Sequence, residues 1–141
     1  MEPSAGDARC FGCGPENEAG LHLDFRQTGT TTVECIYIVP AHLCGGPRTV
    51  HGGIQATILD EALGKAAQAG FADGPRRRMV TAEFSLRYRR PAPLGEPLTA
   101  RAELVRVEGA NVFVRGALFG SDGTELTTAE ARWKVTGLAE E

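Results

Sequence analysis

The chain of 141 residues is long enough for one domain with a substantial core and too short for two independent enzymes. Its net charge of −3 excludes the overall basic field that draws proteins to nucleic acid or to anionic membranes. No apolar run reaches the roughly 18 residues that a membrane span requires, and the N-terminus lacks the features of a secretory signal. We therefore expect a cytoplasmic protein without a nucleic-acid or membrane partner.

The first part of the chain predicts a loop followed by a β-hairpin. Residues 1–9 are small and polar and predict a flexible N-terminus, so a single domain is expected over 10–141. Apolar and polar residues alternate over 21–25 and predict a strand. The segment 32–39 has apolar side chains on both faces and predicts a second, well-buried strand.

A change from alternating to helical spacing marks the middle of the chain. From about Thr49 to Ala69 the apolar residues recur at helical spacing. The segment carries only three charged residues, Asp60, Glu61 and Lys65, which predicts a helix buried on nearly all sides.

Beyond the helix, four segments with a period of two predict four strands. The first runs through Val80 to Tyr88 and places Thr81 on its polar face, and the last runs through Ala129 to Val135. Short turns between these strands predict an antiparallel meander. The expected fold class is α+β, with an antiparallel sheet of about six strands wrapped around one long central helix. Since the helix and the sheet edges would still lack partners, we expect at least a dimer.

The segment His51–Ala62, together with the order of the elements, resembles the hotdog-fold acyl thioesterases of the phenylacetate-degradation (PaaI-like) type. In that family a His-Gly-Gly sequence opens the central helix, and the carboxylate nine residues after the histidine is catalytic. Asp60 occupies that position here. The segments Cys10–Asn17 and Tyr88–Gly95 also resemble signatures of one branch. The resemblance implies a thioester hydrolase, acting on acyl-coenzyme A or acyl-carrier-protein thioesters as a homodimer or homotetramer.

Thioester hydrolysis needs a group that activates water or attacks the carbonyl, and donors for the developing oxyanion. We predict that Asp60 is the general base or nucleophile, and that the free N–H groups of Gly52 and Gly53 form the oxyanion hole at the helix N-terminus. Eight residues separate Gly52 from Asp60, so they stand about 12 Å apart along one helix. Both must lie within roughly 3 Å of one carbonyl group. Each site is therefore expected to take its two groups from two antiparallel helices of a dimer.

Other residues near this motif receive less direct roles. His51 is expected to fix the helix start by hydrogen bonds rather than to transfer protons. Thr81 is either an ordinary strand residue or, as the resemblance implies, a hydroxyl near the catalytic water. Glu61 is expected to be solvated or paired with Lys65. Some relatives have an asparagine before the His-Gly-Gly, but this chain has the loop Cys44–Pro47, and we assign no side chain of that loop to chemistry.

The sequence offers few candidate residues for binding the substrate or a metal. Arg87, Arg89 and Arg90 form a basic cluster that could hold the phosphates of coenzyme A or the phosphopantetheine of an acyl carrier protein, and no other cofactor is expected. The pair Cys10 and Cys13 lacks a second closely spaced ligand pair, so it predicts a structural knuckle and no metal site.

Two alternative functions stay open. A hotdog hydratase or dehydratase generally uses a histidine with a carboxylate on or beside the helix, whereas the nearby histidine here, His51, precedes the helix body. A non-catalytic module that binds acyl thioesters would need no catalytic carboxylate at all.

Overall fold

The structure is a computed structural model that describes residues 7–139. The predicted flexible terminus therefore falls mostly outside the described residues, as do positions 140 and 141 of the predicted domain. The part of that terminus that is described, residues 7–9, forms a turn: the Arg9 N–H donates to the Asp7 carboxylate at 2.7 Å, and the Cys10 N–H donates to the Asp7 carbonyl at 3.0 Å.

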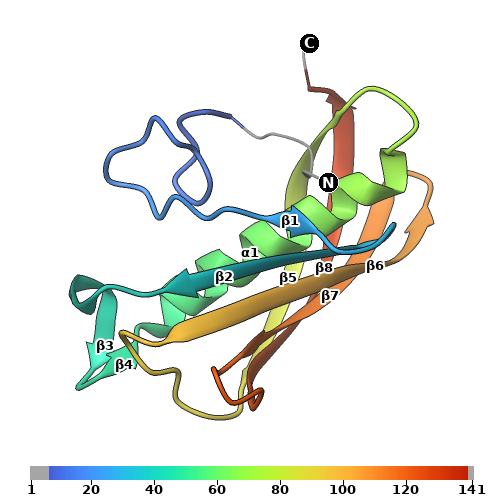
Figure 1. Ribbon diagram of the computed structural model, residues 1–141. Helices are drawn as coiled ribbons and strands as arrows, with labels where there is room; N and C mark the ends of the chain where they lie inside the picture. Colours follow the sequence, from blue (N-terminus) through green and yellow to red (C-terminus); the bar gives the residue numbers. More distant parts are fainter. Residues whose placement is uncertain (1–6, 140–141) are drawn as a thin grey trace.

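One long helix lies along one face of a six-stranded antiparallel sheet (Figure 1). The spatial order of the sheet is β1-β2-β6-β7-β8-β5. Its strands are β1 (Arg26–Gln27), β2 (Thr32–Ile38), β5 (Arg77–Tyr88), β6 (Pro97–Glu108), β7 (Asn111–Phe119) and β8 (Glu125–Leu138). The remaining elements are helix α1 (Gly52–Gln68), the 3-10 helices η1 (Ala41–Leu43) and η2 (Ala69–Phe71), and a two-stranded sheet of β3 (Cys44–Gly46) and β4 (Thr49–Val50).

The predicted fold class is confirmed, because the main sheet has six strands and packs on one central helix. The predicted N-terminal hairpin is found only in part: residues 21–25, the predicted first strand, form no strand, and β2 pairs instead with the two residues of β1 that follow them. Leu21 and Leu23 are buried, yet their N–H groups donate to the carbonyls of Phe11 and Gly12, at 2.8 and 2.9 Å. The backbone of this segment therefore bonds to the preceding loop and not to the sheet.

The predicted meander is wrong in one connection. Strand β5 pairs with β8, at the far edge of the sheet, and β6 pairs with β2 instead. The chain leaves the sheet after β2 and re-enters at the opposite edge after helix α1. Of the four strands after the helix, short turns join only β6, β7 and β8 as neighbours.

Burial is more one-sided than the sequence predicts. In β2, Val33 and Cys35 are buried, whereas Ile36 and Ile38 are 65% and 54% exposed on the other face. Helix α1 likewise buries one face, and Asp60 on its other face is only partly buried. The expected burial on nearly all sides is therefore not reached within one chain.

Small residues let the helix approach the sheet closely. Ala102, Gly116 and Ala129 lie opposite one another on three adjacent strands. Helix α1 contributes Ala62 and Ala66 to the same core, and both are fully buried. Among residues 7–139, no helix has both the length and the apolar character needed to cross a lipid bilayer.

Candidate active site

His51 caps the N-terminus of helix α1. The imidazole Nδ1 of His51 accepts a hydrogen bond from the Gly53 N–H at 2.9 Å. The backbone N–H of His51 donates to the Leu43 carbonyl at 3.0 Å. Strand β3 passes close to His51, since a Cβ atom on Gly45 would lie 2.9 Å from the His51 Cα. Glycine at position 45 is thus needed for packing, and the histidine holds the helix start in place.

Gly52 and Gly53 differ in what their N–H groups do. The Gly53 N–H is donated to His51, whereas no acceptor among the described residues takes the N–H of Gly52. The Gly52 carbonyl accepts a hydrogen bond from the Tyr88 hydroxyl at 2.7 Å. Gly52 therefore combines a fixed position with a donor that is open to a ligand.

Two polar side chains near the helix start, those of Gln55 and Tyr88, were not predicted from the sequence to have a role there. Gln55 is 4% exposed; its amide donates to the Val50 carbonyl at 3.3 Å and accepts from the hydroxyl of Thr127, which is fully buried. The sequence places Tyr88 at the end of a predicted strand and in the segment Tyr88–Gly95, but it gives this residue no role at the helix. Its place at the end of a strand that faces the helix is the one signal that could have indicated the contact to Gly52.

Asp60 lies just over two helical turns after Gly52. Its carboxylate accepts a hydrogen bond from Thr81 Oγ1 at 2.8 Å. Burial raises the pKa of the Asp60 carboxyl above its ordinary value. The hydrogen bond from Thr81 acts against this rise, and the negative charge of Glu61 adds to it. Asp60 is therefore a partly desolvated carboxylate with a fixed orientation.

A β-bulge turns Thr81 toward the helix. Thr81 is opposite Trp133 in β8, but Glu83 is opposite the next residue, Arg132, so Ala82 is an additional residue in the ladder. Such a bulge reverses the direction in which side chains before it point. The prediction that Thr81 lies on the polar face of its strand is therefore wrong, and the bulge explains how its hydroxyl reaches Asp60.

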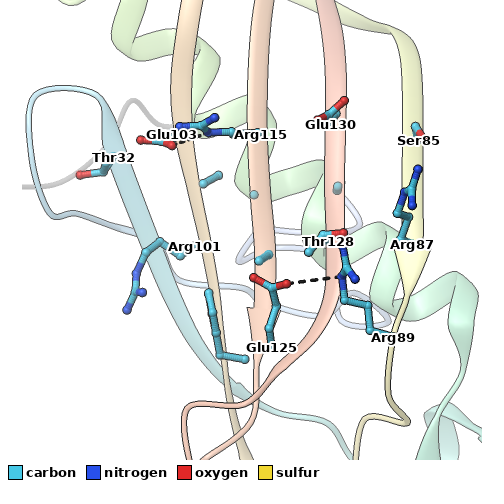
Figure 2. A pocket seen from close by; sticks show the side chains of 15 residues that line it. Thr32, Ser85, Arg87, Arg89, Arg101, Glu103, Arg115, Glu125, Thr128 and Glu130 are labelled. Carbon is cyan, nitrogen blue, oxygen red and sulfur yellow. Dashed lines mark hydrogen bonds and ion pairs between the residues drawn. The ribbon is translucent and has the colours of Figure 1, made fainter.

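Arg87, Arg89 and Arg90 do not gather around Asp60. Arg87 and Arg89 line a hollow of about 630 Å³ on the face of the sheet that points away from helix α1 (Figure 2). The Arg89 guanidinium pairs with Glu125 at 3.4 Å, and Arg90 lines a separate hollow beside the turn between β7 and β8. The larger hollow does not include Asp60, so the helix site and the basic residues lie on different faces of the sheet.

Pairing of β6 with β7 adds two arginines to this hollow that sequence spacing did not indicate. Arg101 donates to the Glu34 carboxylate at 2.9 Å, and Arg115 pairs with Glu103. The hollow thus carries charges of both signs (Figure 2).

The fold agrees with what known proteins show. Residues 48–127 match the family model of the thioesterase superfamily, so the chain belongs to that superfamily. The predicted resemblance to hotdog thioesterases is confirmed. Over 114 residues the chain is 32% identical to acyl-coenzyme A thioesterase THEM4 of Rattus norvegicus, which covers 79% of this chain and 47% of the rat protein. The chain thus spans about half the length of the curated relatives it matches.

Solved structures give the same result. A thioesterase superfamily protein, RHA08564, superposes with a TM-score of 0.75 at 33% identity, covering 84% of this chain and 59% of that one. A phenylacetic acid degradation-related protein from Ralstonia eutropha JMP134 superposes with a TM-score of 0.71 at 27% identity, covering 82% and 86% of the two chains.

The cap that His51 provides should stabilise the folded protein. The variant His51→Ala should lose about 1 kcal/mol of unfolding free energy, because the Gly53 N–H loses its acceptor. His51→Asn should retain most of that stability, since asparagine is a strong N-cap residue. Denaturant unfolding measures both. The exposed His42 supplies the control, and His42→Ala should change stability by less than about 0.5 kcal/mol. Equal losses for the two alanine variants would contradict the capping role.

Proposed function

We propose that this protein hydrolyses acyl thioesters, with coenzyme A as the carrier, at sites shared between the two subunits of a homodimer. The observation that carries the proposal is the half-buried Asp60 carboxylate, which accepts a hydrogen bond from Thr81. Asp60 belongs to the same helix that presents the N–H of Gly52. Membership of the thioesterase superfamily supports the reaction class. The name of the rat relative, acyl-coenzyme A thioesterase, supports the carrier.

In the proposed reaction, Asp60 activates the attack on the thioester carbonyl. As a general base it takes a proton from water while the water oxygen bonds to the carbonyl carbon; as a nucleophile it bonds to that carbon itself, and water later cleaves the anhydride. The hydrogen bond from Thr81 engages one carboxylate oxygen and leaves the other for this step. The Gly52 N–H stabilises the oxyanion until the carbon–sulfur bond breaks and the thiol leaves.

The sheet edge supports a shared site. Strand β5 is the last in the order, pairs only with β8 among the described strands, and carries exposed apolar side chains at Val80 and Tyr88. A second copy paired along β5 would cover these side chains and continue the sheet. Since Thr81 on this edge strand contacts Asp60, the carboxylate lies beside the proposed interface. Antiparallel helices across it would bring Gly52 of one subunit to Asp60 of the other.

Arg87 in β5, together with Arg89 and Arg90 just beyond the end of that strand, is proposed to bind the phosphates of coenzyme A. Among the described residues no hydrogen bond or ion pair engages the guanidinium of Arg87, whereas the guanidinium of Arg89 pairs with Glu125. Both arginines are exposed. Arg90 is also exposed, at the end of the same segment. Guanidinium groups that are exposed and only partly paired can bind phosphate oxygens.

A hydratase or dehydratase is less well supported. The ring nitrogen Nδ1 of His51 already accepts the Gly53 N–H, so the histidine serves the helix cap. The non-catalytic binding module differs from the proposal in two measurable ways: it would bind acyl thioesters without turnover, and it would not depend on the carboxylate of Asp60.

Substitution of the carboxylate tests the reaction. Asp60→Asn should lower kcat/KM for acyl-coenzyme A by about 100-fold or more, because the amide can neither take a proton nor attack the carbonyl. Thiol release from a panel of acyl-coenzyme A substrates measures the rate. The exposed Asp73 gives a matched control, since Asp73→Asn removes the same charge from a loop and should leave the rate unchanged. Full activity of Asp60→Asn would refute the role of Asp60 as general base or nucleophile. Binding of acyl-coenzyme A without turnover by the unmodified protein would show that the protein is a binding module.

The oxyanion donor can be removed without breaking the helix. Gly52 is the first helical residue, a position that accepts proline, and its predecessor His51 has φ −56° and ψ 134°, which suits a residue before proline. Gly52→Pro should therefore keep the fold and lower kcat by about 100-fold. Gly52→Ala, which retains the N–H, should stay within about tenfold of the unmodified protein, because an added Cβ meets Tyr88 only at 3.5 Å. Equal rates for the two variants would exclude the Gly52 N–H as the donor.

A further inference from the structure

The loop of residues 10–14, which we call the knuckle, is folded tightly against helix α1. The Gly14 N–H donates to the Cys10 carbonyl at 2.8 Å and closes the loop. A Cβ atom on Gly12 would collide with the side chain of Glu61, so the loop can reach this contact only with glycine at that position. The knuckle and the middle of the helix are thus built to touch.

Three potential metal ligands meet at this contact. The Cys10 Sγ, the Cys13 Sγ and a carboxylate oxygen of Glu61 all lie within 4.8 Å of one another. The Cys10 thiol donates to Glu61 Oε1 at 3.3 Å. Ligands of one tetrahedral zinc ion, bound at about 2.0 to 2.3 Å, lie roughly 3.5 Å apart, so small shifts of the side chains suffice.

Charge in the cluster favours a divalent cation. Two thiolates and a carboxylate carry three negative charges, which one divalent ion and the ammonium of Lys65 would balance. The positive charge of Lys65 favours the thiolate form of Cys13. A bound cation favours the thiolate in the same way and more strongly.

We propose that Cys10, Cys13 and Glu61 bind a zinc ion that clamps the knuckle to helix α1. A site with three protein ligands takes a water molecule as its fourth ligand. The sequence-based expectation of no metal rested on the missing second pair of closely spaced ligands. The third ligand instead comes from the helix, 51 residues after Cys10, and only folding brings it to the knuckle.

The proposed clamp acts on structure and is separate from the proposed catalytic site. Glu61 and Asp60 are consecutive on the helix and point about 100° apart. A zinc ion on Glu61 would fix the central turn of the helix and thereby the backbone that carries Asp60. Metal binding can therefore be measured without any assay of catalysis.

Cobalt(II) gives a direct test, because thiolate ligands produce a charge-transfer band and tetrahedral geometry produces intense visible bands. Titration of the metal-free, reduced protein should show one cobalt per chain, displaced by zinc. Cys10→Ser, Cys13→Ser and Glu61→Gln should each weaken binding by about 100-fold or more, judged from the 10- to 100-fold losses that more remote changes cause. The exposed Cys44 gives the matched control, and Cys44→Ser should bind as the unmodified protein does. Glu61→Gln keeps both cysteines and the shape of the side chain, so it tests the site even if a cysteine variant fails to fold.

Thiol protection tests the unmodified protein. Zinc should slow alkylation of Cys10 and Cys13 by at least about tenfold, as measured by mass spectrometry of labelled peptides, and should leave the rate at Cys44 unchanged. It should also raise Tm by roughly 5 to 10 °C at a hundredfold excess over the dissociation constant. A missing thiolate–cobalt band, or a band that survives in Cys13→Ser, would overturn the proposal. So would a Cys10–Cys13 disulfide that forms in air at the same rate with and without zinc.

Discussion

The fixed distance between Gly52 and Asp60 along helix α1 is the constraint on which the proposed active site depends. One helix offers an N–H group at Gly52 and a carboxylate at Asp60, and its rise of about 1.5 Å per residue keeps the two far apart. No side-chain rotation closes that gap, because the donor belongs to the backbone. A thioester carbonyl can contact both kinds of group only if a second helix supplies one of them. The edge position of β5, beside Asp60, is where the second helix would arrive.

The surroundings of the two groups follow from how the helix meets the sheet. Small residues on the central strands allow one face of the helix to pack closely, and Asp60, on another face, is only partly removed from water. A bulge in β5 aims the Thr81 hydroxyl at that carboxylate, and the end of the same strand places the Tyr88 hydroxyl on the Gly52 carbonyl. One edge strand therefore holds both ends of the helix segment that we propose as catalytic. About 100° around the helix from Asp60, the knuckle packs against Glu61.

Periodicity predicted the elements well, because the change from alternating to helical spacing is local. The helix, the six-stranded sheet and the family could all be inferred from the sequence. The pairing of β5 with β8 could not, since it depends on the edge at which the chain re-enters the sheet. The orientation of Thr81 was missed because nothing in the alternation marks the bulge, and the contact of Glu61 with Cys10 was missed because those residues are distant in the chain.

Complementation between two inactive variants tests the shared site most directly. Asp60→Asn and Gly52→Pro subunits, carrying different affinity tags and expressed together, should form mixed dimers in which one site has both groups intact. A randomly assembled mixture should then recover about one quarter of the unmodified activity, since about half of the dimers are mixed and each has one of two sites. Purified mixed dimers with no more activity than their parents would contradict a site shared between subunits.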